Sequence, residues 1–163
     1  MTEDATPDSE PARPEVRYRQ ASGADVPEIA RARALDPSTE PGDSRLAAYV
    51  AGTHHPQQAL ALRAVFVAVS GRSVVGYIAG HLTQRHGCDG EVQYLWVAPQ
   101  HRRQGIATAL VRQLGGWFAA RRARRVCVNV AEDNVVAQRF FRGCGAGALE
   151  RHWLVWADIK GAA

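Results

Sequence analysis

The run Leu95-Trp96-Val97-Ala98-Pro99-Gln100-His101-Arg102-Arg103-Gln104-Gly105-Ile106-Ala107 decides the fold. An apolar strand ends before Pro99, a loop containing Arg and Gly follows, and a helix then begins. Apolar residues recur along this helix to about Ala123 with the period of an amphipathic stripe, at Ile106, Leu110, Leu114 and Trp117. The first turn of a helix presents free backbone N–H groups and the positive end of the helix dipole. The run therefore predicts a strand, an anion-binding loop and a long helix, with phosphate as the expected guest.

The side chains of the loop also fit a phosphate. Gly105 places no Cβ where a ligand would press on the chain, and Ala107 keeps the first helical turn low. Arg102 and Arg103 can add charge-assisted hydrogen bonds. No Gly-Lys-Ser/Thr follows, and G-x-G-x-x-G is absent, so the loop is neither a Walker loop nor a dinucleotide fingerprint.

The flanking sequence alternates between strand and helix patterns. Upstream, two β-rich runs joined by Gly71-Arg72-Ser73 predict a hairpin. Downstream, residues 126–130 are apolar on both faces apart from Asn129, which is typical of a central parallel strand. We expect strands over 16–19, 65–70, 74–82, 91–97, 126–130 and 149–159, and helices from Val26, over 44–51, from 106 and over 135–142. This order of elements indicates the α/β class.

The 163 residues correspond to one domain. Residues 1–15 hold five acids and three prolines, which predicts a disordered acidic tail before a single domain over 16–163. The longest apolar run, about six residues, is far below the roughly 20 of a membrane-spanning helix, so a membrane protein is not expected. The three cysteines form no CxxC pair and the histidines lack metal-ligand spacing, so neither disulfides nor a metal site is expected.

The formal net charge of +4 conceals an acidic start and a more basic body, which should attract anions. A phosphorylated cofactor, nucleic acid and an acidic partner are all compatible with charge alone. The basic run 121–125 ends a predicted helix, where cations complement the dipole, and it has no interleaved aromatic residues. Nucleic-acid binding is therefore not expected. No apolar segment follows Met1, so we expect no secretory signal and a cytoplasmic location.

At the strand–loop–helix junction the chain resembles the Gcn5-related N-acetyltransferase (GNAT) family, whose mark is Q/R-x-x-G-x-G/A. Here the mark reads Arg102-x-x-Gly105-x-Ala107. The strand 91–99 looks like the family's fourth strand, and 130–145 looks like its fifth strand and fourth helix. The resemblance covers roughly residues 16–159. It implies a mixed six- or seven-stranded sheet, flanked by about four helices and splayed between the fourth and fifth strands.

The resemblance also implies transfer of an acetyl group from acetyl-CoA to an amine. The N–H groups at 102–107 would hold the pyrophosphate, and the exposed edge of the fourth strand would bond the pantetheine amides as an added strand does. One N–H there would polarise the thioester carbonyl. Asn134 would bond the pantetheine arm; its alternative role is a helix N-cap. The cofactor-binding residues expected are Leu95, Trp96, Val97, Arg102, Arg103, Gln104, Gly105, Ile106, Ala107, Asn134 and Phe141.

An attacking amine must lose a proton. Glu91, which begins the fourth strand and is expected at the mouth of a partly dry cleft, is the catalytic base that the resemblance implies. The alternative is an exposed Glu at a strand end with no role. The family's usual acid, a Tyr on the fourth helix, is replaced here by Phe141, which cannot donate a proton. Either the thiolate leaves unassisted, or Tyr94, Cys144 or water serves as the donor, or catalysis has been lost.

Three further residues are candidates for the acceptor side. Asn129 either contacts substrate or cofactor or is a satisfied internal amide. Asp36 begins a segment with three acids suited to a cationic amine or polyamine, although a solvated loop explains it equally well. Trp153 and Trp156 have odd spacing and so should face opposite ways, one toward the core and one, Trp153, toward the acceptor cleft or a dimer contact.

The leading hypothesis is an enzyme that acetylates the primary amine of a small molecule by direct attack in a ternary complex. The alternatives are a protein or peptide N-acetyltransferase and a non-catalytic acetyl-CoA-binding sensor. About 18 residues follow Gly145, enough for one good strand or a very short hairpin. A missing edge strand would leave pairing groups exposed, and a homodimer is one remedy.

Overall fold

The computed structural model describes residues 12–38 and 45–162. Most of the acidic tail predicted over 1–15 lies outside them. Within them the strands are β1 (Val16–Gln20), β2 (Ala59–Ser70), β3 (Ser73–Thr83), β4 (Gly90–Val97), β5 (Val126–Asn129), β6 (Gly147–Glu150) and β7 (Trp153–Trp156). The α-helices are α1 (Val26–Ala34), α2 (Arg45–Ala51), α3 (Ile106–Ala120) and α4 (Val135–Gly143).

All seven strands form one sheet in the order β1-β2-β3-β4-β5-β7-β6. Every neighbouring pair is antiparallel except β4 and β5, which are parallel. The expected mixed sheet with four helices is therefore confirmed. The single last strand predicted over 149–159 is wrong in detail, because a turn at Arg151 and His152 divides this segment into the hairpin β6–β7. The edge strand is present, so the argument for a homodimer from its absence does not apply; the dimer itself stays a prediction.

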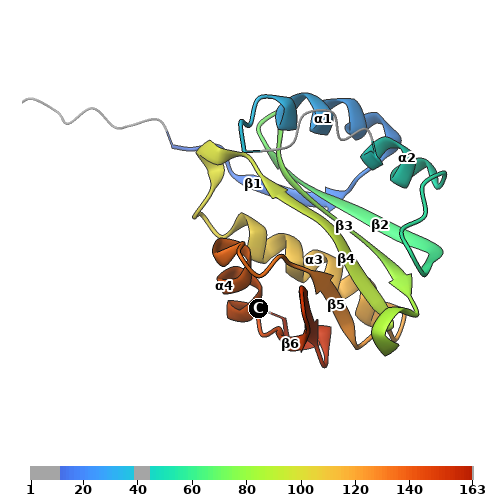
Figure 1. The fold of residues 1–163 in the computed structure, drawn as a ribbon. Coiled ribbons are helices and arrows are strands. Elements are labelled where there is room, and N and C mark those ends of the chain that lie inside the picture. The colour runs from blue at the N-terminus through green and yellow to red at the C-terminus, as the bar shows by residue number, and fades with distance from the viewer. Residues whose placement is uncertain (1–11, 39–44, 163) are drawn as a thin grey trace, which may run out of the picture.

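Helices cover both faces of the sheet and create two separate cores (Figure 1). On one face α1 and α2 pack over β2 and β3 through Ile29, Leu46 and Tyr49. On the other face α3 and α4 pack over the sheet through Leu110, Phe118 and Phe141, among others. The long helix lies close to the strands because Gly80 and Gly90 lack a Cβ, which would collide with the Phe118 ring.

Gln93 forms a β-bulge in the middle of β4. Ala79 pairs with Tyr94 and Gly80 pairs with Val92, so Gln93 is an extra residue without a partner in β3. A bulge shifts the alternation of the side chains by one position. As a result Glu91 precedes the bulge, Tyr94 and Trp96 follow it, and all three face the side of α1 and α2, whereas Val92, Leu95 and Val97 face α3.

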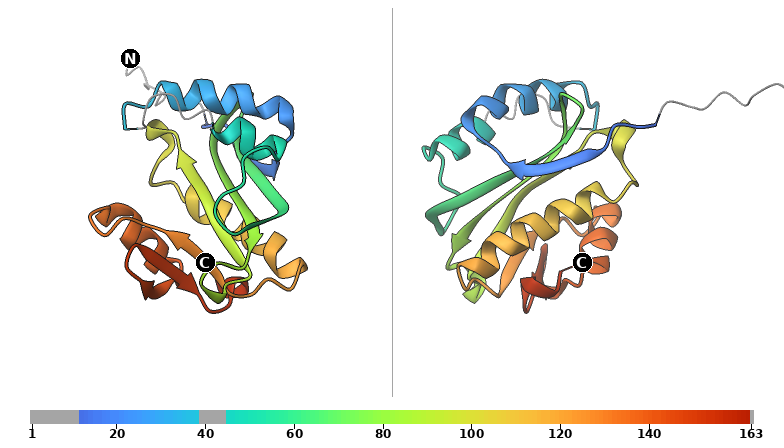
Figure 2. Two further views of the ribbon diagram at one scale, coloured as in Figure 1. Left: turned by 45° about the vertical axis from the view of Figure 1, so that its right-hand side comes forward. Right: turned by 180° about the vertical axis from the view of Figure 1, so that it is seen from behind.

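The strands β4 and β5 separate just beyond the start of their pairing. Only Gly90, Glu91 and Val92 pair with β5, at Val126, Cys127 and Val128. Past this point the two strands diverge, as the left view of Figure 2 shows. The rest of β4, from Gln93 onward, has no strand on that side. The splay expected between the fourth and fifth strands is thus present, and the bulge stands at the point of divergence.

Candidate active site

A cavity of about 1120 Å³ opens where β4 and β5 diverge. Its walls come from β4 between Val92 and Val97, from the loop before α3, from the end of β5 and from one face of α4. Parts of the chain that are far apart in sequence thus meet at one site. A cavity of this size suits a ligand larger than a drug-sized molecule, whose pockets measure roughly 300–1,000 Å³.

The loop before α3 offers a row of unpaired backbone donors. The N–H groups of residues 103–108 have no hydrogen-bond partner within the described chain. Gly105 precedes α3 with a φ of +80°, and a Cβ built there would meet nothing within 4 Å. Its conformation therefore requires glycine, and the space beside it is open. The 15-residue helix directs its positive end to the same place, so the loop fits the pyrophosphate of acetyl-CoA.

The Arg102 side chain is turned away from this row of donors. Its Nε donates to the Val97 carbonyl at 2.9 Å, and its Nη2 donates to Asp36 Oδ2 at 2.7 Å. Arg102 thus braces the loop, and Arg103, which is exposed, remains the arginine able to reach a phosphate.

Asp36 is an internal carboxylate, only 3% exposed. It accepts hydrogen bonds from Ser38 at 2.7 Å, from the Trp96 indole at 2.8 Å and from Arg102. The bonds from Ser38 and Trp96, together with the charge of Arg102, lower the pKa of Asp36 to about 2. Asp36 does not line the cavity, so its expected contact with a cationic acceptor does not fit the structure.

The other expected cofactor residues lie on the cavity as the resemblance implied, except that Gln104 does not line it. Leu95, Trp96 and Val97 line it along the free edge of β4. Asn134 caps α4, because its side chain accepts from the Ala137 N–H at 3.2 Å. Its amide NH₂ group has no partner among the described residues and can still donate to a pantetheine amide. The cap and ligand roles of Asn134 are therefore compatible.

Phe141 lines the cavity from α4 with 6% of its surface exposed. Its ring packs edge-on against Trp156, with centroids 5.8 Å apart. Of the two side chains that could replace the missing Tyr donor, Tyr94 lines the same cavity. Cys144 does not line it, and burial raises the pKa of its thiol.

Glu91 is neither at the mouth of the cleft nor at an exposed strand end, which corrects both expectations. It is 3% exposed and does not line the cavity. Its carboxylate lies between His81, with Nε2 3.5 Å from Oε2, and Arg85, with Nη1 3.7 Å from Oε1. Its strand neighbours Val92, Gln93 and Tyr94 do line the cavity and form this part of its wall. A proton that passes from the cavity to Glu91 must therefore cross the wall.

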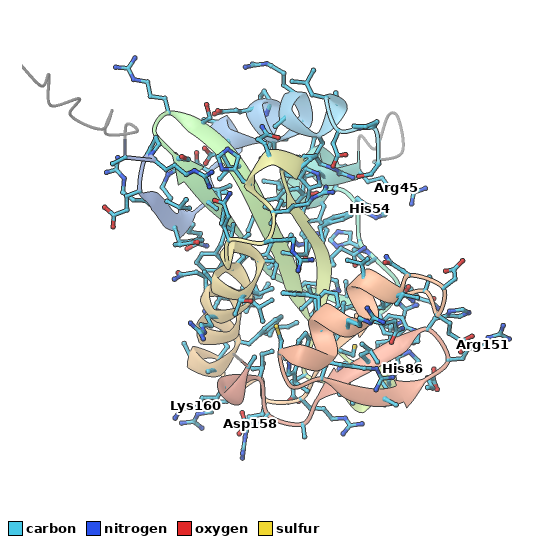
Figure 3. The ribbon with its side chains drawn as sticks, turned by 90° about the vertical axis from the view of Figure 1, so that its left-hand side faces the viewer. Arg45, His54, His86, Arg151, Asp158 and Lys160 are labelled. Atoms are coloured by element: carbon cyan, nitrogen blue, oxygen red, sulfur yellow. The ribbon has the colours of Figure 1, made fainter. Side chains whose placement is uncertain are left out.

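The two remaining acceptor candidates, Asn129 and Trp153, lie in different parts of the structure. Asn129 is exposed, lines the cavity, and makes no side-chain hydrogen bond within the described chain, so it is not a satisfied internal amide. Trp153 and Trp156 do face opposite ways, as predicted, because they belong to different apolar clusters. Trp153, however, is 8% exposed and lies under Arg85 and His86, away from the main cavity. Figure 3 shows His86 near the β6–β7 hairpin, with Arg151 toward its tip.

Two residues were missed by the sequence reasoning. Gln93 lines the cavity with a buried Oε1 that has no hydrogen-bond partner among the residues the structure describes. His81 is fully buried in β3 opposite Glu91. A lone His in an apolar strand was the available signal for His81, whereas the bulge that exposes Gln93 left no mark in the sequence.

The described residues contain no group of three or more His, Cys, Asp or Glu side chains able to hold a metal ion. None of the helices in this part of the chain is long and apolar enough to cross a membrane.

Comparison with known proteins places this geometry among acetyltransferases. A solved structure from Desulfovibrio desulfuricans, described as a putative acetyltransferase of the GNAT family, superposes with a TM-score of 0.72 and 14% identity, covering 89% of this chain and 99% of that one. At this identity the likeness shows the fold.

Two curated proteins match parts of the sequence. A mycothiol acetyltransferase of Corynebacterium diphtheriae is 34% identical over 86 residues, which are 50% of this chain and 27% of that protein. An aminoglycoside N(6')-acetyltransferase type 1 of Acinetobacter haemolyticus is 32% identical over 62 residues, 38% of this chain and 43% of that protein. The match thus spans less than half the length of either relative.

The model of the acetyltransferase (GNAT) family matches residues 29–146, from the middle of α1 to the end of the loop after α4. This range contains the loop before α3 (residues 102–105), called the phosphate loop below, together with the free edge of β4 and the α4 cap. Acetyl-CoA is the acyl donor of the family. By sequence and by fold, then, this chain belongs to the GNAT acetyltransferases.

Proposed function

We propose that this protein is an acetyl-CoA-dependent N-acetyltransferase that acts on the primary amine of a small molecule by direct attack in a ternary complex. The observation that carries the proposal is the continuity of one cavity of about 1120 Å³ from the free N–H groups of the phosphate loop to Asn129 on β5. A cofactor and an acceptor in one cavity can react without a covalent enzyme intermediate. Holding the two together supplies much of the rate.

The residues divide the work along the cavity. Acetyl-CoA would supply an activated acetyl thioester. The N–H groups of 103–108 bind its pyrophosphate, and the free edge of β4 with Asn134 holds its arm. The amine nitrogen forms a bond to the acetyl carbon as the carbon–sulfur bond breaks. The amine proton passes to Glu91, carried by water through the wall at Gln93 and Tyr94, and the thiolate takes a proton from Tyr94 or water.

The polar groups near the acceptor end indicate the kind of amine. Apart from His101, the charged side chains lining the cavity within the described chain are Arg102, Arg103 and Arg139. Arg102 braces the loop, whereas Arg103 and Arg139 are exposed and suit the phosphates of the cofactor. The polar groups from β4, β5 and the segment after α1 are neutral, namely Ser38, Gln93, Tyr94 and Asn129. Glu40 and Asp43 of the acidic segment lie outside the described residues. The neutral groups that do line this end favour a small, hydrogen-bonding amine as the acceptor.

An acceptor screen tests this proposal. Purified protein is incubated with acetyl-CoA and a panel of small amines and peptides, thiol release is followed, and products are identified by mass spectrometry. We expect acetylated small amines, with no product from peptides or from a Gly105→Glu variant. Acetylation of peptides alone would replace the small-molecule assignment.

A second function, an acetyl-CoA sensor without turnover, is favoured by one observation: Phe141 occupies the place of the family's usual acid. The same screen separates the two functions. Tight CoA binding with no thiol release from any amine or peptide would favour the sensor.

A further inference from the structure

Three buried side chains, Tyr49 from α2, His81 from β3 and Glu91 from β4, lie in contact one after another behind the wall of the cavity. His81 is 0% exposed and pairs in register with Glu91 across the antiparallel β3–β4 ladder. Its Nδ1 lies 2.9 Å from the Tyr49 hydroxyl, and its Nε2 lies 3.5 Å from Glu91 Oε2. Neither Nε2 nor Oε2 has a hydrogen-bond partner among the described residues. Two buried polar atoms that face only each other call for an explanation.

The tautomer of a neutral His81 follows from counting donors. Tyr49 is 0% exposed, and burial raises the pKa of its phenol, so Tyr49 keeps its proton. When that O–H donates to Nδ1, the neutral imidazole carries its own proton on Nε2, where it points at Glu91. The opposite tautomer would set the Nε2 lone pair against a carboxylate oxygen. Of the two neutral tautomers, only Nε2–H accepts from Tyr49 and also turns a proton, rather than a lone pair, toward Glu91 Oε2 at 3.5 Å.

The other polar groups near His81 and Glu91 are compatible with the Nε2–H tautomer of His81. Arg85 approaches the second carboxylate oxygen, Oε1, at 3.7 Å. Arg63 stacks on the Tyr49 ring, with its guanidinium carbon 4.6 Å from the centroid. Cys127 of β5 lies in register with Glu91. Burial raises the pKa of the Cys127 thiol, and the neighbouring Cys88 and Glu91 raise it further. The Cys127 thiol therefore stays neutral beside a carboxylate that lies against one arginine and one imidazole.

We propose that His81 is a positioning residue for Glu91: fixed by Tyr49 as the Nε2–H tautomer, it donates to Oε2 and so holds and stabilises the charged carboxylate that receives the substrate's proton. The inference rests on the proposed function, because it takes Glu91 to be the base. His81 does not touch the substrate. Its effect must therefore pass through Glu91, and this dependence can be measured.

Two substitutions of His81 separate its two contacts. In His81→Gln the side-chain amide reaches the position of Nε2 and can still donate to Glu91, whereas in His81→Asn the shorter amide reaches only the position of Nδ1, toward Tyr49. We expect His81→Asn to lower kcat by about 10- to 100-fold, the value of a buried hydrogen bond to a charged group, with the acceptor KM unchanged. His81→Gln should retain most of the activity.

The pH profile of kcat/KM is a second measurement, and its acid limb would not shift if His81 had a structural role alone. Loss of the donor makes the charged carboxylate less favourable, so the acid limb of kcat/KM should move to higher pH in His81→Asn. The deficit should fade at high pH, where the amine is already neutral. Thermal stability and acetyl-CoA affinity of both variants serve as folding controls. Equal losses in His81→Gln and His81→Asn at every pH would overturn the positioning role.

A double-mutant cycle with Glu91→Gln distinguishes failure of the inference from failure of the proposed base. If His81 acts through Glu91, then His81→Asn changes nothing further in the Glu91→Gln background. An additive loss in the double variant would overturn the inference while Glu91 remains the base. Full activity of Glu91→Gln would overturn the base and, with it, the role given to His81.

A measurement on the unaltered protein keeps the inference testable even if the His81 variants do not fold. Long-range proton–nitrogen NMR correlations of histidine-labelled protein report which ring nitrogen carries the proton. We expect the Nε2–H tautomer at His81, and in Tyr49→Phe a mixture of tautomers. The Nδ1–H tautomer or a charged ring at neutral pH in the wild type would overturn the proposal.

Discussion

The carboxylate of Asp36 accepts a hydrogen bond from the guanidinium of Arg102 at 2.7 Å, across 66 positions of sequence. The contact joins the start of the segment after α1 to the loop before α3. The Trp96 indole adds a second bond to the same carboxylate at 2.8 Å, from the strand whose free edge lines the cavity. One buried carboxylate thus links the segment after α1, the strand β4 and the loop before α3.

Replacing Asp36 should therefore loosen the phosphate loop. We expect Asp36→Asn to weaken acetyl-CoA binding about 10-fold, because Arg102 loses its charged partner and no longer braces the loop. Isothermal titration with acetyl-CoA measures the change. Asp25→Asn is the matched control. Asp25 accepts a similar hydrogen bond from Arg19 at 2.8 Å, and neither residue lines the cavity. Equal effects of the two variants on binding would contradict the role given to Asp36.

The same carboxylate predicts how stability responds to acid. Hydrogen bonds from Ser38 and Trp96, with the charge of Arg102, lower the pKa of Asp36 to about 2, below an unfolded value near 3.8. A lowered folded-state pKa contributes stability that is complete above about pH 4 and lost as the pH falls toward 2. The melting temperature of Asp36→Asn should thus lie below that of the wild type at pH 7, and the gap should close between pH 4 and pH 2. A gap that stays constant over this range would exclude a stabilising charged Asp36.

Gly105 supplies a direct test of the phosphate loop. Gly105→Glu adds a side chain and a negative charge beside the free N–H groups, and at φ +80° it also strains the backbone. We expect the variant to lose the rise in melting temperature that acetyl-CoA gives the wild type. Gly116→Glu makes the same chemical change on the exposed side of α3, where a Cβ meets nothing within 4 Å. It should keep the full rise, and a folded Gly105→Glu protein with wild-type affinity would refute the loop assignment.

Glu91→Gln should lower kcat/KM by roughly 10²- to 10⁴-fold at neutral pH, the usual worth of a positioned base, and leave acetyl-CoA affinity nearly unchanged. The deficit should shrink as the pH rises, because a free amine needs no base. Glu132→Gln, at an exposed carboxylate paired with Arg151, is the control and should retain full activity. A Glu91→Gln enzyme within about twofold of the wild type at pH 7 would leave Glu91 with a structural role alone.

Local patterns were enough to predict the helices, the phosphate loop and the parallel β5 from the sequence. The stripe from Ile106 to Trp117 and the glycine at 105 act within one element or one turn, so their consequences can be derived before the chain is folded. The α4 cap at Asn134 is of the same kind, because it involves a residue only three positions away.

Features that depend on register or on distant contacts were not predictable in this way. The bulge at Gln93 shifts the alternation of β4, and this shift puts Tyr94 on the face of Glu91. The pairing of Glu91 with His81, just before the bulge, depends on the register of β3 and β4, so a residue expected at an exposed or partly open strand end is buried instead. Asp36 appeared suited to a cationic substrate because its partner Arg102 is remote in sequence.

The departing thiolate needs a proton. Tyr94 lines the cavity from β4, whereas Phe141 faces it from α4 without a donor group. If Tyr94 supplies the proton, Tyr94→Phe should lower kcat about 10-fold or more and leave acetyl-CoA affinity unchanged. The double variant Tyr94→Phe/Phe141→Tyr should recover part of the loss in kcat, because it restores a hydroxyl to the cavity. Phe141→Tyr alone should raise kcat only where thiolate departure limits the rate. Steady-state kinetics with leaving thiols of different acidity decide the point: a Tyr94→Phe deficit that grows as the thiol becomes less acidic identifies Tyr94 as the acid, whereas an unchanged kcat in Tyr94→Phe assigns the proton to water.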